Sequence, residues 1–156
     1  MKQIELTQGK FAIVDDEDFE EVNQYNWYFA QGYAVRNVKV SGKQKTQLMH
    51  RIVTNCPADM DVDHANHDKL DNQKVNLRVC SRSENNQNQQ TRTYSKSSVY
   101  KGVIFNKHAN KWMARIMLNY KHKFLGYFAN EIDAAIAYNV AAIEMFGEFA
   151  LLNDIE

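Results

Sequence analysis

The sequence predicts an α+β fold in three parts. These are a small β-rich module over residues 1–50, a polar strand–loop–strand–helix motif over 51–92, and a three-stranded antiparallel sheet packed on one helix over 97–156. Short apolar runs alternate with turn residues at both ends of the chain, whereas the middle is almost without apolar residues. With 156 residues, 44% hydrophobic and 12% aromatic, the chain can build cores for small domains of this kind.

The first module is typical of strands joined by tight turns. Residues 33–40 alternate as in a half-buried strand, and the turn at Ser41-Gly42 predicts that the chain folds back beside it. Phe19, Val22 and Tyr25 recur at the spacing of a short helix. The expected strands cover residues 11–14, 33–40 and 44–49, and the expected helices cover 16–25 and 48–53.

The last module follows a small polar segment, residues 90–98, that is typical of a linker. Three short strands are expected over residues 101–105, 112–118 and 122–128. A helix should then begin after Asn130 as N-cap and end at Gly147. We expect its apolar face to comprise Ile132, Ala135, Ile136, Ile143 and Phe146.

The polar middle motif concentrates residues suited to phosphodiester chemistry. It holds Asp63-His64, then Asn76-Leu77-Arg78, and then Glu84-Asn85-Asn86. A carboxylate is a ligand for a hard cation, a neutral imidazole can take a proton from water, and carboxamides can hold both in place. Ser81 with Glu84 predicts a capped helix behind the second strand, which completes a strand–loop–strand–helix order.

The stretch DVDHANHDKLDNQKVNLRVCSRSENNQN resembles the HNH endonuclease motif of phage and mobile-element homing enzymes. The resemblance implies that Asp63 and Asn85 bind one Mg²⁺ or Mn²⁺ and that His64 is the general base. It also implies that Asn76, the central residue of the motif, braces the loop within the catalytic set. Because side chains alternate along a strand, Asp63 and His64 should diverge unless the backbone bends there.

Other polar residues near the motif have open or structural interpretations. Arg78 could clamp a phosphate or pair with Asp68 or Asp71, and the sequence does not choose between them. We expect His67 to occupy a turn and His50 to be packed rather than in contact with phosphate.

The charge distribution points to a polyanionic partner although the net charge is zero. No acidic residue lies between Asn85 and Asn130. That segment carries Arg92, Lys96, Lys101, Lys107, Lys111, Arg115, Lys121 and Lys123, with aromatic residues Tyr100, Phe105, Trp112 and Tyr120 among them. Phosphate neutralisation beside base or sugar contact requires this combination, although a solvated basic face would look the same.

The blocks YKGV, KWMARI, LGYF, AAIAY and LN, spread over about residues 97–154, resemble the plant APETALA/ethylene-response DNA-binding domain. The resemblance implies a three-stranded sheet on one helix that lies in the major groove of double-stranded DNA. The expected DNA-binding residues are Lys101, Lys111, Trp112, Arg115, Lys121 and Lys123. Trp112 could equally pack on the helix. Lys101, Ile104, Asn106 and Met117 stand where the plant proteins carry several Arg residues, so we expect altered or tolerant sequence specificity.

Composition excludes several other classes. Cys56 and Cys80 stand alone, so no structural zinc site is expected. No apolar run approaches the length of a membrane span, and Met1 to Glu5 is unlike a signal peptide, so a cytoplasmic protein is expected.

The leading hypothesis is a metal-dependent DNA endonuclease that nicks as a monomer, while a symmetric homodimer could cut both strands. The alternative is a non-catalytic DNA-binding or regulatory protein with a vestigial motif. A structural module that binds no DNA is the third class.

Overall fold

The computed structural model describes residues 1–89, 97–118 and 121–155. The expected linker of residues 90–98 lies largely outside these ranges, as do Arg92, Lys96 and Tyr120. The chain divides into two compact units, Met1–Arg82 and Ser83–Glu156. The fold is α+β, as the sequence predicts.

The first unit contains three small antiparallel sheets. Their strands are β1 (Lys2–Glu5) with β2 (Phe11–Val14), then β3 (Tyr28–Ala30), β4 (Tyr33–Val40) and β5 (Lys43–Leu48) in that order, and β6 (Asp61–His64) with β7 (Leu77–Cys80). The helices are the 3-10 turn η1 (Thr7–Gly9), α1 (Asp16–Asn23) and α2 (Met49–Val53), and α3 (Arg82–Gln87) begins at its end. The strands and helices expected within residues 11–53 are therefore confirmed, while β1 and β3 are additional.

One hydrophobic core runs through the first unit. Val14 and Val22 from the N-terminal part, Met49 from α2, and Val62 and Leu77 from the β6–β7 hairpin belong to the same buried cluster. The sequence predicts a boundary near residue 50, whereas the structure packs residues 1–50 and the hairpin together. The hairpin is too polar and too short to bury a core alone, so it packs against the apolar side chains of the N-terminal part.

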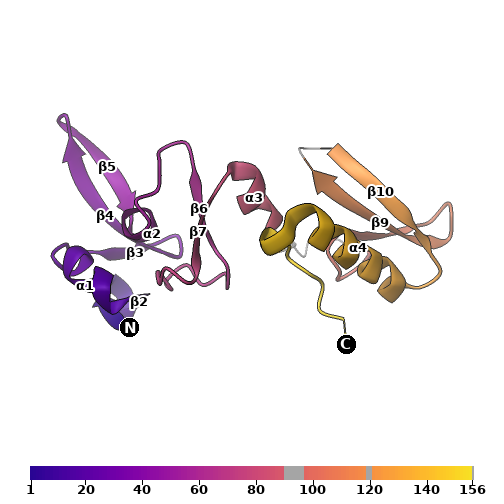
Figure 1. Cartoon of the computed structure of the whole chain (residues 1–156), viewed down its shortest axis with the longest axis horizontal. Helices are drawn as coiled ribbons and strands as arrows, with labels where there is room; N and C mark the ends of the chain where they lie inside the picture. The colour runs from indigo at the N-terminus through magenta and orange to yellow at the C-terminus, as the bar shows by residue number, and fades with distance from the viewer. Residues whose placement is uncertain (90–96, 119–120, 156) are drawn as a thin grey trace. The chain divides into compact units, whose positions relative to one another are not determined.

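The second unit is a three-stranded antiparallel sheet with a helix along one face (Figure 1). Its strands are β8 (Val103–Asn106), β9 (Lys111–Leu118) and β10 (Lys121–Phe128), in the order β10-β9-β8. The helix α4 (Glu131–Phe146) is followed by η2 (Gly147–Phe149). Asn130 caps α4 by accepting a hydrogen bond from the Asp133 amide at 2.7 Å, and Gly147 ends it at φ 53°. The three strands and α4 confirm the sequence expectation.

The face that α4 turns to the sheet differs from the one expected. Ala134, Ala135, Ala141 and Ala142 are buried with Tyr138, whereas Ile132, Ile136 and Ile143 are exposed. The predicted stripe is therefore wrong except for Ala135 and the partly buried Phe146. Small side chains let the helix approach the sheet closely, so the larger isoleucines lie outside.

Candidate active site

The candidate nuclease residues lie on the hairpin of β6 and β7. In its register Asp63 is opposite Arg78 and His64 is opposite Leu77. Asp63 and His64 are both buried, each 6% exposed. Leu77 belongs to the hydrophobic core, so His64 leaves the strand on the core side and Asp63 leaves it on the other. The alternation of side chains therefore separates the predicted base from the predicted ligand.

Asp63 forms an ion pair with its cross-strand neighbour Arg78. Its Oδ2 accepts a hydrogen bond from Arg78 Nε at 3.1 Å and a second, very short one from Nη2. Two residues earlier on β6, Asp61 Oδ2 forms an ion pair with Arg82 Nε at 3.1 Å. The expected Asp partners of Arg78 are Asp68 and Asp71, but the structure pairs it with Asp63 because the register of the hairpin places the two opposite each other. A fork-shaped guanidinium on a buried carboxylate fixes the direction of that carboxylate.

His64 lies against two other rings. The centroid of His50 is 5.0 Å from that of His64 with the rings perpendicular, and Tyr33 is 6.1 Å from His64 and 5.3 Å from His50. Burial lowers the pKa of His64, and burial with the charges of His64 and Arg51 lowers the pKa of His50 to about 3. Both imidazoles are therefore neutral at pH 7. The expectation that His50 is packed is confirmed.

The loop between the two strands is closed by Asn76. Its Oδ1 accepts from the Asn66 amide at 2.9 Å, and its Nδ2 donates to the Asp71 carbonyl at 2.8 Å. Asn76 is 5% exposed, so both bonds are shielded from water. His67 sits in the turn at φ 64°, as expected. This geometry makes the side chain of Asn76 part of the loop rather than a group aimed at a substrate.

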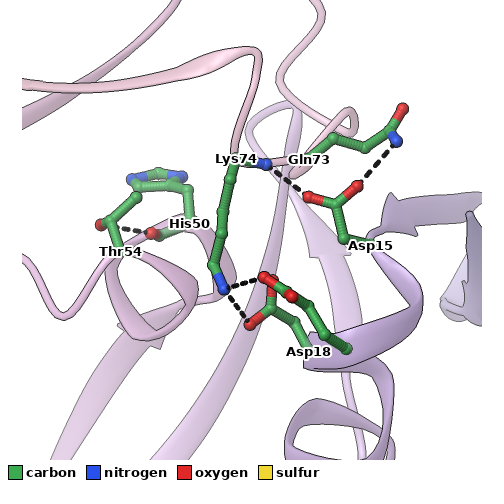
Figure 2. A network of polar contacts seen from close by, with 7 residues as sticks. Asp15, Asp18, His50, Thr54, Gln73 and Lys74 are labelled. Carbon is green, nitrogen blue, oxygen red and sulfur yellow. Dashed lines mark hydrogen bonds and ion pairs between the residues drawn. The ribbon is translucent and has the colours of Figure 1, made fainter.

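The same loop is bound to the N-terminal residues of the chain. The Ile13 amide donates to the Leu70 carbonyl, and the Asn72 amide donates to the Ile13 carbonyl, both at 2.8 Å. Asp15 accepts from Gln73 Nε2 at 3.0 Å and from the Lys74 amide at 2.8 Å, as Figure 2 shows. These bonds lower the pKa of the Asp15 carboxyl, with the Gln73 contact contributing most.

Lys74 extends this connection toward α1. Its Nζ lies 2.8 Å from Asp18 (Figure 2) and 2.6 Å from Glu17, and hydrogen bonds to the Asp18 and Glu17 carboxylates raise its pKa. Backbone pairing and two acidic side chains of α1 therefore hold the loop that joins the strands of the hairpin. The N-terminal part of the first unit is the scaffold on which the candidate site is built.

The donor atoms available for a metal ion are few. Among the described residues, no group of three or more His, Cys, Asp and Glu side chains is placed to hold a metal ion. Asp63 offers carboxylate oxygen, which suits Mg²⁺ or Mn²⁺ that keep most of their waters. A carboxylate has about four lone-pair sites, which is more than the two hydrogen bonds from Arg78 occupy. Asn85 lies on α3 and belongs to the second unit, whose position relative to the first is not determined.

The six residues expected to bind DNA fall into three groups in the second unit. By strand register, Lys111 and Arg115 point to the face of the sheet opposite α4. Lys121 and Lys123 are exposed on the edge strand β10, and Lys123 leaves it on the side of Ile116, which is buried under the helix.

The remaining two expected residues are engaged in internal contacts. Trp112 packs into the cluster under α4 and edge-on against Phe105, with the ring centroids 5.1 Å apart. Packing on the helix is thus the interpretation the structure shows for Trp112. Lys101 Nζ donates to the carbonyls of Gln87 at 2.6 Å and Gln89 at 3.0 Å, and burial lowers its pKa to about 8.

Sequence reasoning did not find Tyr33 or Asp15, which lie far from the motif along the chain. No local pattern distinguishes Tyr33 from any other strand aromatic. Asp15 stands in an acidic run that reads as a helix start. Only the fold shows that each contacts the site or the loop beside it.

Comparison with known proteins agrees with this geometry. A family model described as HNH endonuclease matches residues 49–87. An uncharacterized HNH endonuclease of Acanthamoeba polyphaga mimivirus is 32% identical over 151 residues, which are 95% of this chain and 77% of the viral protein. No solved structure matches the chain significantly.

The C-terminal part is similar to plant proteins. Two AP2-like ethylene-responsive transcription factors of Arabidopsis thaliana are 43% and 41% identical over 58 and 59 residues. Each match covers 36% of this chain, and 17% and 12% of the respective plant protein. In the described part of the chain, no helix is long and apolar enough to cross a membrane.

Proposed function

This chain belongs to the HNH endonuclease family, and we propose that it is a divalent-metal-dependent endonuclease that hydrolyses phosphodiester bonds of double-stranded DNA. The observation that carries the proposal is the β6–β7 hairpin. It holds a buried carboxylate and a buried imidazole on the two sides of one strand, and its loop is closed by a buried carboxamide. Burying these polar groups costs free energy, and a hairpin with a purely structural role would not need them.

Each residue of the hairpin has a role in this proposal. Asp63 holds the cation, with Arg78 orienting its carboxylate through Oδ2. When bound, Mg²⁺ or Mn²⁺ supplies positive charge for the phosphate oxygens and lowers the pKa of an attached water. His64 takes a proton from the attacking water. Asn76 keeps the loop in shape, and Asn85 is the expected second ligand.

The second unit is proposed to hold the DNA. The plant proteins similar to it are transcription factors by name. The segment from Asn85 to Asn130 carries no acidic residue, so a phosphate backbone meets no like charge there. A monomer with one hairpin would nick one strand. We also propose that the enzyme is of the homing type, as the sequence resemblance implies. Sequencing the ends of the products would give the site and the overhang.

Cleavage of supercoiled plasmid tests the proposal directly. The wild-type chain with Mg²⁺ or Mn²⁺ should convert it to nicked circles, and EDTA should stop the reaction. His64→Ala and Asp63→Ala should each lower the rate by about a hundredfold or more while binding persists in a gel shift. His108→Ala, at an exposed turn of the second unit, is the matched control and should cut at the wild-type rate.

The alternative function, a non-catalytic DNA-binding or regulatory protein, is favoured by one observation. The carboxylate expected to bind the metal is already engaged by Arg78. Intact plasmid after prolonged incubation with the wild-type chain, despite a clear gel shift, would establish this alternative.

A further inference from the structure

We propose that the open face of the C-terminal sheet reads the 5-methyl groups of thymine in the DNA major groove, so that the chain prefers T-rich duplexes. The inference rests on the proposed function, which supplies duplex DNA as the partner. It adds the chemical feature that this unit recognises. The carrying observation is the unusual apolar content of a sheet face that α4 leaves uncovered.

The two faces of the sheet are assigned by register and burial. Val103, Ala114 and Ile116 are buried against α4. Residues between them along the strands must point the other way, because strand side chains alternate. The cross-strand pairs Ile104 with Met113 and Arg115 with Phe124 therefore lie on the opposite face. We call this opposite side the open face; it comprises Ile104, Asn106, Lys111, Met113, Arg115, Met117, His122, Phe124 and Tyr127.

Large apolar side chains dominate the open face. Met117, Phe124 and Tyr127 are 49%, 55% and 45% exposed, and Met113 lies opposite Tyr127 on one side and Ile104 on the other. Phe124 and Tyr127 meet edge to face with their centroids 5.1 Å apart, and the Tyr127 hydroxyl accepts from Asn106 Nδ2 at 3.1 Å. An apolar patch of this kind marks a binding surface in a soluble protein.

One end of the open face is hollowed. A cavity of about 500 Å³ there is lined by Ile104, Arg115, Met117 and His122 of the open face, and its wall also includes Asn86 and Gln87 of α3 with Gly102, Val103 and Tyr138. Its size and mixed lining suit the insertion of an apolar group beside a polar edge. The Arg115 guanidinium is the only one among the described residues of the sheet, so a single fork is available for a guanine edge.

The positive charge of the open face favours DNA as its partner. The open face carries Lys111, Arg115 and His122, and the sequence has no carboxylate from Asn85 to Asn130. A polyanion is therefore attracted. A second copy of this chain would bring two identical cationic faces together, which is unfavourable. Within the sheet, β9 and β10 form a long antiparallel pair, and a β-ribbon of two strands has the width to enter the major groove of B-DNA.

The chemistry of the groove then selects the base. Thymine presents a C5-methyl group there, whereas cytosine presents an amino donor and guanine two acceptors. Apolar side chains gain by contact with a methyl group. Both kinds of base pair present polar atoms in the groove, so contact with the methyl group is what distinguishes A·T from G·C on an apolar surface.

Replacing thymine by deoxyuridine in the probe tests the inference, since it removes only the methyl group. The full chain, in EDTA to prevent cutting, is titrated with two fluorescent duplexes of one mixed sequence, one built with dT and one with dU. Binding to the dT duplex should be tighter by about fourfold for each methyl group contacted. In a G·C-rich duplex, 5-methylcytosine should likewise strengthen binding.

Two matched variants locate the effect. Phe124→Thr should bring the dT and dU affinities together, whereas Phe11→Thr, a similarly exposed strand phenylalanine of the first unit (48% against 55%), should preserve the ratio. Circular dichroism checks that both fold.

Three outcomes would overturn the inference. Tight but equal binding to both duplexes removes the methyl readout and leaves the nuclease proposal standing. A DNA-independent dimer that Phe124→Thr dissociates would make the open face an interface between copies. Failure to bind or cut any duplex at low salt would remove the proposed function itself.

Discussion

The two units use their sheets in opposite ways. In the first unit the polar residues of interest are inside: Asp63, His64 and Asn76 are 5–6% exposed, Asp63 and Asn76 are hydrogen-bonded, and His64 lies against the rings of Tyr33 and His50. In the second unit the residues of interest are outside, where Met117, Phe124 and Tyr127 are about half exposed. Fixed groups suit a reaction, because their positions are set before the substrate arrives. An exposed face suits binding, because it can be covered.

The largest expected effect separates the stability of the two units. Gly102 has φ +77°, and a Cβ there would meet the Tyr138 ring and lie 2.6 Å from the Arg115 carbonyl oxygen. Gly102→Ala should destabilise the second unit by about 3 kcal/mol or more through strain and overlap. Hydrogen exchange should show faster exchange in β8–β10 and unchanged exchange in β6 and β7.

Gly42→Ala is the control for this substitution. Gly42 has nearly the same φ, +76°, but a Cβ there meets nothing within 4 Å. Its cost should be that of the left-handed backbone alone, about 1 kcal/mol. Equal losses for both variants would show that the contact with Tyr138 and Arg115 contributes nothing.

The next effect is confined to the first unit. Asn76→Ala removes two shielded hydrogen bonds and leaves the Asn66 amide and the Asp71 carbonyl without them. Each such group costs about 1–3 kcal/mol, so we expect a loss of about 2 kcal/mol or more and slower plasmid nicking. Asn76→Asp keeps the acceptor for Asn66 and should lose less. Unchanged exchange of the loop amides in Asn76→Ala would contradict the bracing role.

A smaller effect should appear on acidification. Burial lowers the pKa of His50 to about 3, below its usual 6.5, so the unfolded chain binds a proton in this range that the folded chain does not. The stability is complete above pH 6.5 and falls as the pH drops toward 3. At pH 5 the loss attributable to His50 is about 2 kcal/mol. The difference in unfolding free energy between pH 7.5 and pH 5 should shrink by this amount in His50→Phe.

Local pattern was sufficient for most elements and for the location of the motif. The strands over 33–40 and 112–118 and the helix from Asn130 to Gly147 follow from periodicity and caps. Periodicity could not tell which face of α4 is buried, because alanines and isoleucines both count as apolar. The alanines are the buried ones because only small side chains allow α4 to pack closely on the sheet.

The site was predictable only in part, for a similar reason. Residue types marked Asp63 and His64, and strand alternation anticipated that they diverge. The pair of Asp63 with Arg78 depends on cross-strand register. The contacts of Tyr33 and Asp15 depend on pairing between segments far apart in the sequence. These long-range terms have no signature within a short window of residues.

The central claim is that the first unit cuts the DNA and the second unit binds it. The most direct test measures the single-turnover cleavage rate against protein concentration for His64→Ala and Arg115→Ala. The account predicts that His64→Ala lowers the rate at saturation and leaves the half-saturating concentration unchanged. Arg115→Ala should raise the half-saturating concentration and reach the wild-type rate at saturation. A His64→Ala chain that cuts at the wild-type rate once saturated, or an Arg115→Ala chain that stays slow, would contradict it.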